Sequence, residues 1–231
     1  MEEETGMNLI ILGAGPVGSR LVERALAGGH DVVLVEPDET LAEDAAREYD
    51  VRVLAMGVGD DRFPEESRLD DAEALIATTT DDSVNIMAML LGQEAGVATL
   101  TSTVNQPGHV NLFRRLGVRV LADPERLVAQ HLLDITLLPE ASDVTTLRDG
   151  QQIIELQLDA ASPLTGRTAE QIHADGVLDE TLEIIARVRE GETQLLKPDE
   201  PLASGDGLVL FATQRLRGRR RRLFRESTGE G

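Results

Sequence analysis

Short apolar runs alternate with helix-like segments through the first 140 residues of the chain. Strands that are buried on both faces of a parallel sheet are apolar throughout, as residues 9–12, 32–35 and 74–77 are. The segments between them place apolar residues three and four apart, which is typical of helices that pack one face on a sheet. The predicted strands are residues 9–12, 32–35, 51–55, 74–77, 97–100 and 118–121, and the predicted helices are 15–27, 38–48, 83–95 and 108–116. This alternation predicts an α/β fold, a Rossmann-like doubly wound parallel sheet.

A longer segment with apolar residues at helical spacing, residues 124–138, follows the last of these strands. We predict a helix that leaves the sheet and packs on a second copy of the chain. Pro139 and the residues 141–143 after it indicate a domain boundary. The first domain is therefore expected to span residues 1–140.

The pattern changes after this predicted boundary. Residues 151–158 alternate apolar and polar as a half-buried strand does, 182–188 and 208–211 are strand-like, and 166–173 suit a short helix. Short strands around one or two helices predict a small α+β domain over residues 141–214. A domain of this size is expected to complete its core on a partner copy.

The chain is strongly acidic, with 42 Asp and Glu against 22 Lys and Arg and a formal net charge of −20. A surface of this sign repels phosphate backbones, so nucleic acid is excluded as a partner. Lys197 is the only lysine, and aromatic residues make up 2% of the chain. This composition is typical of a cytosolic protein from a halophile, in which salt screens a dense anionic surface. An acidic protein from a GC-rich genome is the alternative.

No apolar run approaches the roughly 20 residues that a membrane-spanning helix needs. The chain has no cysteine, which excludes disulfides and thiolate metal sites. Its acidic first residues do not resemble a secretion signal. We therefore expect a soluble, cytoplasmic protein that reaches a membrane only as a peripheral partner.

An arginine-rich tail, residues 215–231, opposes the charge of the rest of the chain. It holds seven arginines against Glu226 and Glu230. Basic clusters of this kind bind anionic membrane surfaces or acidic patches on partner proteins. A solvated tail that folds back on the acidic chain is the alternative, and both stay open at this point.

A glycine-rich turn, Gly13-Ala14-Gly15-Pro16-Val17-Gly18, connects the first predicted strand to the first predicted helix. It matches the GxGxxG pattern in the strand–turn–helix context that this pattern requires. In dinucleotide-binding sites the first glycine permits the tight turn, the second lets the backbone approach a diphosphate, and the third lets helix and strand pack closely. The free N–H groups at the helix N-terminus then face the phosphates. The turn therefore predicts nucleotide binding.

Glu36 ends the second predicted strand. An acidic side chain at this place accepts hydrogen bonds from the hydroxyls of a ribose. A carboxylate there also repels a 2′-phosphate, which favours NAD over NADP.

Two loops at the ends of other strands are expected to line the same cleft. Gly57-Val58 follows the third strand and Thr78-Thr79-Thr80 follows the fourth, and ligands of open α/β sheets lie beyond the carboxyl ends of the strands. In the helix after the threonines we expect Asp81 or Asp82 to cap the N-terminus and Asn85 to face the cleft.

The four histidines are scattered, and none has the spacing of a metal site or a catalytic relay. A hydride-transfer enzyme also needs a base and usually a cation that orients its substrate, and residues 141–214 offer no such set. We therefore expect no catalytic residue, no metal ligand, and a protein that senses a nucleotide rather than turning it over. An NAD-dependent oxidoreductase is the alternative.

Several motifs lie in order along the chain, at residues 9–18, 36, 57–59, 79–85 and 105–107, and then at 162–167, 186–191 and 205–210. Together they resemble the N- and C-terminal RCK modules (regulator of K⁺ conductance) of bacterial and archaeal Trk/Ktr potassium-uptake regulatory subunits. The resemblance implies a cytoplasmic regulatory subunit, not an enzyme, that forms a homodimer and assembles into a ring. It would gate a membrane potassium transporter or channel subunit from the inner face of the membrane. A nucleotide sensor of another cation transporter or antiporter is the alternative.

The resemblance also implies nucleotide contacts at residues 13–17, Glu36, Thr79, Thr80 and Thr103. An arginine that the family often has at the position of Thr103 is absent here, and the Ktr branch has an arginine where this chain has Pro16. These departures disfavour recognition of the γ-phosphate of ATP. We therefore expect NAD(H), as in the Trk branch, with ADP, AMP or ATP as alternatives.

Overall fold

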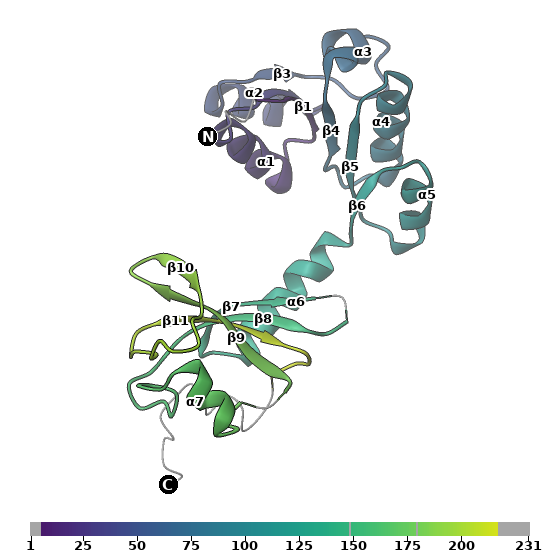
Figure 1. Cartoon of the computed structure of the whole chain (residues 1–231). Coiled ribbons are helices and arrows are strands. Elements are labelled where there is room, and N and C mark those ends of the chain that lie inside the picture. Colours follow the sequence, from purple (N-terminus) through teal and green to yellow (C-terminus); the bar gives the residue numbers. More distant parts are fainter. Residues whose placement is uncertain (1–5, 148, 179, 217–231) are drawn as a thin grey trace. The chain divides into compact units, whose positions relative to one another are not determined.

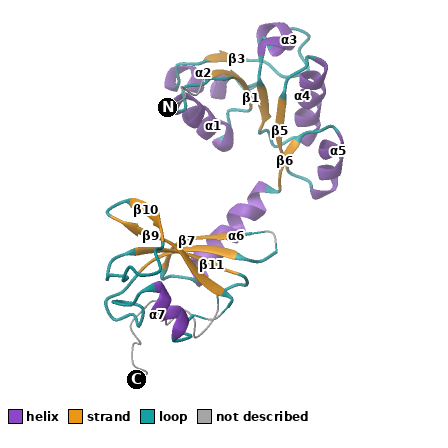
Figure 2. Ribbon diagram, in the orientation of Figure 1, coloured by secondary structure: helices purple, strands orange, loops and turns teal. Residues whose placement is uncertain are grey.

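The computed structural model describes residues 6–147, 149–178 and 180–216. Its contacts group into two compact units, Met1–Glu125 and Arg126–Gly231. Figure 1 colours the chain by sequence position and Figure 2 by secondary structure. None of the described helices has both the length and the apolar character that crossing a bilayer requires.

The first unit is built on a parallel sheet with the strand order β3-β2-β1-β4-β5-β6 (Figure 1). Its strands are β1 (Asn8–Leu12), β2 (Asp31–Val35), β3 (Arg52–Leu54), β4 (Ala74–Ala77), β5 (Thr99–Val104) and β6 (Arg119–Ala122). Its helices are α1 (Pro16–Ala27), α2 (Glu39–Glu48), α3 (Phe63–Glu66), α4 (Asp82–Glu94) and α5 (Val110–Arg115), with the short 3₁₀ helices η1 (Leu69–Asp71) and η2 (Pro107–His109). All pairings in this sheet are parallel, and the strand order changes direction between β1 and β4. The predicted Rossmann-like fold is confirmed.

Strand β1 shows why the central strands are apolar throughout. Successive side chains of a strand alternate between the two faces of a sheet. Ile10 and Leu12 belong to the core beneath α3, α4 and α5, whereas Leu9 and Ile11 belong to the core against α1 and α2. Helices close both faces of the sheet, so the ends of the strands are the places left for a site.

The second unit is an antiparallel sheet with the strand order β10-β9-β11-β8-β7 and a short helix. Its elements are β7 (Ala141–Thr146), β8 (Gln152–Gln157), α7 (Ala169–Ala174), β9 (Leu182–Arg189), β10 (Glu192–Leu195) and β11 (Gly207–Ala212), and α6 (Pro124–Leu137) precedes them. Helix α7 begins at a capping box formed by Thr168 and Gln171. Its Ile172 belongs to the same buried cluster as Ile154 and Leu210 of the sheet. The predicted small α+β domain is confirmed.

Some elements differ from the prediction. Strand β5 occupies residues 99–104 rather than 97–100, because its threonines, although polar, are β-branched and suit a strand. Residues 141–143, which we expected between the domains, are the first residues of β7. Strand β10 was not predicted, since all its side chains are exposed and it lacks an apolar alternation. The domain boundary at residue 140 stays a prediction, and residues 217–231 of the tail lie outside the described residues.

Candidate functional site

A cavity of about 880 Å³, which we call the cleft, lies at the carboxyl ends of the parallel strands. It is lined by Leu12, Gly13, Gly15, Pro16, Val17, Glu36, Pro37, Leu41, Gly57, Val58, Gly59, Thr78, Thr79, Thr80, Asp81, Val84, Met87, Thr103, Asn105, Pro124 and Glu125. These residues follow or end all the strands from β3 at one edge of the sheet to β6 at the other. With neighbouring strands about 4.8 Å apart, the outer strands are about 24 Å apart. The cleft therefore suits an elongated ligand.

The three glycines of the turn between β1 and α1 have different structural reasons. Gly13 has a φ of +101°, which L side chains rarely adopt. A Cβ on Gly18 would lie 1.8 Å from the carbonyl oxygen of Gly13, so only glycine lets α1 pack this closely on β1. Gly15 has a φ of −68°, and a Cβ there would meet no atom within 4 Å. Neither the backbone nor the packing of the described residues requires glycine at position 15, and this glycine borders the cleft.

Helix α1 begins at the cleft without a side-chain cap. Its N-cap residue is Gly15 and its first residue is Pro16, and no side chain of the described residues caps it. By contrast, Asp38 accepts hydrogen bonds from two N–H groups at the start of α2, and Asp81 caps α4. The uncapped N–H groups and the positive end of the helix dipole make the start of α1 suited to an anion.

Glu36 connects the glycine turn to the start of α2. It is only 7% exposed, and its Oε2 accepts a hydrogen bond from the Ala14 N–H at 2.7 Å while its Oε1 accepts one from the Asp38 N–H at 2.9 Å. Each carboxylate oxygen has a further lone pair, and Glu36 borders the cleft. Its carboxylate can therefore accept a hydroxyl from a ligand while it holds the turn.

Asn85 supports the wall of the cleft from behind. Its Oδ1 accepts hydrogen bonds from the N–H and the Oγ1 of Thr79, at 3.2 and 2.7 Å. Its Nδ2 donates to the carbonyl oxygens of Thr79 and Thr103, at 3.0 and 3.3 Å. Asn85 is fully buried and does not line the cleft. The expectation that it faces the cleft is corrected, because the threonine loop uses both ends of its amide.

Asp82 does not cap α4, since Asp81 accepts the hydrogen bond from Ser83 N–H at 2.7 Å. Instead the buried carboxylate of Asp82 accepts hydrogen bonds from the N–H and Nδ2 of Asn105, the N–H of Gln106 and Nδ1 of His109, at 2.8 to 3.0 Å.

Burial would by itself raise the pKa of Asp82, but the donors from Asn105, Gln106 and His109 together outweigh it and hold the pKa below its usual value. Asn105 in turn donates from Nδ2 to the Thr79 carbonyl oxygen at 3.2 Å. Asp82 therefore fixes the part of the cleft wall that Asn105 forms.

The charge of the cleft is one-sided. Among its described lining residues Glu36, Asp81 and Glu125 are acidic, and there is no Arg, Lys or His. A bound phosphate would depend on backbone N–H groups rather than on a cation.

The structure brings most of the predicted site residues to the cleft. They are Gly13, Gly15, Pro16, Val17, Glu36, Gly57, Val58, Thr78, Thr79, Thr80 and Thr103. Ala14, Gly18 and Asn85 lie behind it, where they respectively donate to Glu36, pack on β1 and hold the threonine loop.

Sequence reasoning missed the apolar wall and the far end of the cleft. Leu41 and Met87 are 43% and 46% exposed on α2 and α4, outside the apolar stripe that these helices turn to the core. This signal is weak, because Leu90 of α4 is exposed to the same degree and does not line the cleft. Pro124 and Glu125 carry no comparable signal, because only the fold brings the start of α6 to the cleft.

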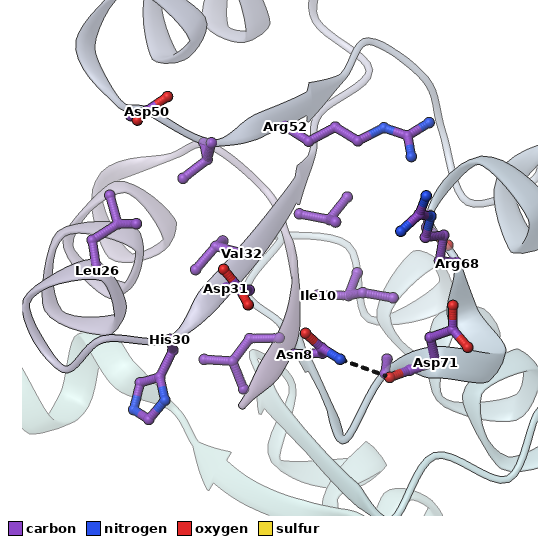
Figure 3. A pocket seen from close by; sticks show the side chains of 15 residues that line it. Asn8, Ile10, Leu26, His30, Asp31, Val32, Asp50, Arg52, Arg68 and Asp71 are labelled. Atoms are coloured by element: carbon purple, nitrogen blue, oxygen red, sulfur yellow. Dashed lines mark hydrogen bonds between the residues drawn. The ribbon is translucent and has the colours of Figure 1, made fainter. Parts of the chain in front are cut away.

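A second cavity of about 810 Å³ lies at the opposite, amino-terminal ends of β1, β2 and β3 (Figure 3). Asn8, Asp31, Arg52, Arg68 and Asp71 are among the residues around it, and Asn8 Nδ2 donates to the Asp71 carbonyl oxygen at 3.4 Å (Figure 3). No glycine-rich turn and no start of an α-helix borders this cavity among the described residues; only the short 3₁₀ helix η1 begins beside it. It therefore lacks the features that make the cleft a candidate site.

Within the described part of the chain, no three or more His, Cys, Asp or Glu side chains are placed to hold a metal ion together. His131 instead contacts the Val144 carbonyl oxygen through Nδ1 at 3.2 Å, and His173 contacts Glu183 at 3.1 Å.

The sequence of residues 9–124 matches the family model of the TrkA-N domain. The "Trk system potassium uptake protein TrkA homolog" of Methanothermobacter thermautotrophicus is 28% identical over 94% of this chain and 99% of that protein. The homolog of Archaeoglobus fulgidus is also 28% identical, over 89% of this chain but 47% of its own length, so the chain spans about half of this relative.

Solved structures share the fold at lower identity. The GsuK channel is similar with a TM-score of 0.62 at 22% identity, over 92% of this chain and 38% of that one. The structure described as "GsuK channel bound to NAD" has a TM-score of 0.59 at 21% identity, over 92% of this chain and 38% of that one.

Proposed function

The chain belongs to the TrkA-N domain family, and from this premise we propose that it is a nucleotide-sensing regulatory subunit that gates a membrane potassium uptake system by a ligand-dependent conformational change. The names of its relatives, which are potassium uptake proteins, support this role. The partner is then a membrane potassium transporter or channel subunit, and the protein works in the cytoplasm at the inner face of the membrane without catalysing a reaction.

We propose NAD(H) as its ligand. The single observation that carries this is Gly15, which neither its backbone angle nor its packing requires, at the uncapped start of a helix that borders the cleft. A side chain there would occupy the space that a diphosphate needs. The span of the cleft over all the strands supports a dinucleotide over a mononucleotide, and a similar fold binds NAD in the GsuK channel.

The residues of the cleft have distinct roles in this proposal. The N–H groups at the start of α1 would bind the diphosphate, and Glu36 would accept hydrogen bonds from the ribose of the adenosine half. Leu41 and Val58 line the cleft on the same side of the glycine turn as Glu36 and would provide apolar contacts to the adenosine half. Thr79 and Thr103 lie on the other side, where the second nucleoside would bind.

We also propose a homodimer formed through α6, and a ring built from such dimers. Five apolar side chains of this helix, Leu127, Val128, Leu132, Leu133 and Leu137, are 41 to 60% exposed. Such a density of exposed apolar residues on one helix is typical of a surface that another protein covers. The arginine-rich tail would contact the anionic membrane surface or the pore subunit.

The test is equilibrium binding of NAD⁺, NADH, ADP, AMP and ATP, measured by calorimetry on wild type and Gly15→Asp. The new carboxylate faces open space, so the variant is expected to fold, and its charge should weaken dinucleotide binding at least about tenfold. Gly108→Asp is the matched control, because a side chain there also meets no atom within 4 Å and Gly108 does not line the cleft. If Gly15→Asp binds NAD(H) as tightly as wild type and Gly108→Asp do, the proposed ligand site is wrong.

The regulatory role needs a separate readout. Potassium or rubidium uptake would be measured in cells that lack this chain and are complemented with wild type, Gly15→Asp or Gly108→Asp. We expect Gly15→Asp to change uptake and Gly108→Asp to act as wild type. Identical uptake with and without the chain would refute the gating role even if the nucleotide binds.

A further inference from the structure

We propose that the cleft selects the oxidised dinucleotide, NAD⁺, over NADH through charge, and that Glu125 is the residue that contributes most to this selection. The inference rests on the proposed function, because it concerns the ligand of the same cleft. It adds that occupancy of the cleft would follow the oxidation state of the nicotinamide pool.

The two halves of the cleft receive different parts of a dinucleotide. The glycine turn lies at β1, in the middle of the sheet, and Glu36 at the end of β2 marks the side of the adenosine ribose. The second nucleoside must then extend toward the ends of β4, β5 and β6. Residues 78–81, Thr103, Asn105 and the start of α6 line that side.

The carboxylates on this second side have no cation to balance them. Asp81 and Glu125 border the cleft, and no Arg, Lys or His of the described residues does. Asp81 uses Oδ1 to cap Ser83 N–H, whereas Glu125 is an exposed residue in the first turn of α6. The local charge is therefore negative where the nicotinamide ring would lie.

The oxidised and reduced rings have nearly the same size and hydrogen-bonding groups but differ in charge. The ring of NAD⁺ is a pyridinium cation, whereas that of NADH is neutral, so NADH carries one more net negative charge. A carboxylate near the ring attracts the pyridinium cation of NAD⁺ but has no charge attraction to the neutral ring of NADH. Because exposed charge pairs are weak in water, Glu125 is expected to contribute about threefold to the affinity ratio and Asp81, which already accepts from Ser83 N–H, less than about twofold.

The test is the ratio of the dissociation constants of NADH and NAD⁺, measured by calorimetry on the full chain at low and at high potassium chloride. We expect wild type to bind NAD⁺ about fivefold more tightly at low salt. Glu125→Gln should reduce this ratio about threefold, and Glu125→Lys should reverse it. High salt should bring all the ratios toward one, because it screens the charges.

Two controls separate this inference from its premise. Glu94→Gln removes the same charge from an exposed residue that does not line the cleft, so it should leave the ratio as in wild type. ADP-ribose lacks the nicotinamide ring, so Glu125→Gln should change its affinity less than twofold.

The possible results have different meanings. If NAD⁺ and NADH bind wild type equally, or if Glu125→Gln and Glu94→Gln shift the ratio alike, the selection by Glu125 is refuted while the nucleotide site stands. If none of the three ligands binds wild type, the proposed function itself fails.

Discussion

Replacing Asp82 by Asn should destabilise the first unit and weaken nucleotide binding together. The carboxylate of Asp82 is 5% exposed and accepts four hydrogen bonds. An Asn side chain keeps one oxygen, which can still accept both donors of Asn105. Its amide group would face the N–H of Gln106 and the ring of His109, so two hydrogen bonds to a charged acceptor are lost.

The size of the effect follows from these contacts. Hydrogen bonds to a charged group contribute about 1.5–3 kcal/mol each. The imidazole of His109 is 43% exposed and can hydrogen-bond to water instead, so part of the lost free energy is recovered. We therefore expect the free energy of unfolding to fall by about 3 kcal/mol, and the affinity for NAD⁺ to fall severalfold because Asn105 and Thr79 lose their fixed positions.

Urea unfolding followed by circular dichroism measures the first effect, and calorimetric titration with NAD⁺ at a temperature where both proteins are folded measures the second. Asp81→Asn is the matched control for stability, since it removes the same charge one residue away and Asn caps a helix about as well as Asp does. Equal losses of stability in the two variants would refute the role of Asp82. A loss of stability with unchanged affinity would refute its link to the cleft.

Three further predictions concern other parts of the chain. Gly18→Ala should lower the free energy of unfolding by more than about 3 kcal/mol in urea unfolding, because its Cβ would lie 1.8 Å from the Gly13 carbonyl oxygen. A Gly18→Ala protein as stable as wild type would contradict this. The Arg189 guanidinium donates to Asp206 at 2.7 and 2.8 Å and lowers the pKa of that carboxyl below its usual 3.8. The stability that this ion pair adds to the folded state is therefore present above about pH 3.8 and is lost as the pH falls through the lower pKa of the folded state. Arg189→Gln should therefore begin to unfold at a higher pH than wild type in an acid titration followed by circular dichroism, and an unchanged midpoint would count against the pair. Leu132 is 55% exposed on α6. Leu132→Asp should therefore convert the proposed dimer to a monomer in analytical ultracentrifugation without loss of helix content. An unchanged sedimentation coefficient would place the interface elsewhere.

The fold could be predicted wherever one physical requirement determined the residue pattern. Strand β1 is buried on both faces and is apolar throughout, so its bounds could be read almost to the residue. Strand β10 is an exposed edge with no such requirement, and nothing in its residues distinguishes it from a loop. The threonines of β5 fall between these cases, because their β-branched shape suits a strand while their hydroxyl groups suggest a loop.

The cleft follows the same principle. The glycine turn and Glu36 lie within one βαβ unit, so their spacing in the sequence carries the information. Asp82 and the contact of Asn85 with Thr103 could not be assigned in this way, because these partners are 18 to 27 residues away and only the sheet order brings them together. Polar residues at a helix start read equally well as caps, and Asp81 and Asp82 show that neighbours can divide the two roles.

In the proposed function, the hydrogen bonds of Glu36 indicate that the residues that recognise the nucleotide differ from those that change position when it binds. Its hydrogen bonds to Ala14 and Asp38 hold the glycine turn and leave a lone pair on each oxygen for a ligand hydroxyl, so binding at this corner need not reorganise it. A ligand changes an equilibrium only through contacts that differ between two states. The end of the cleft at Pro124 and Glu125 is the better source of such contacts, because these residues are the first turn of α6, the helix proposed to contact the second copy. A ligand that bound only at the glycine turn, such as AMP, should then compete with NAD⁺ for the cleft and yet fail to change potassium uptake.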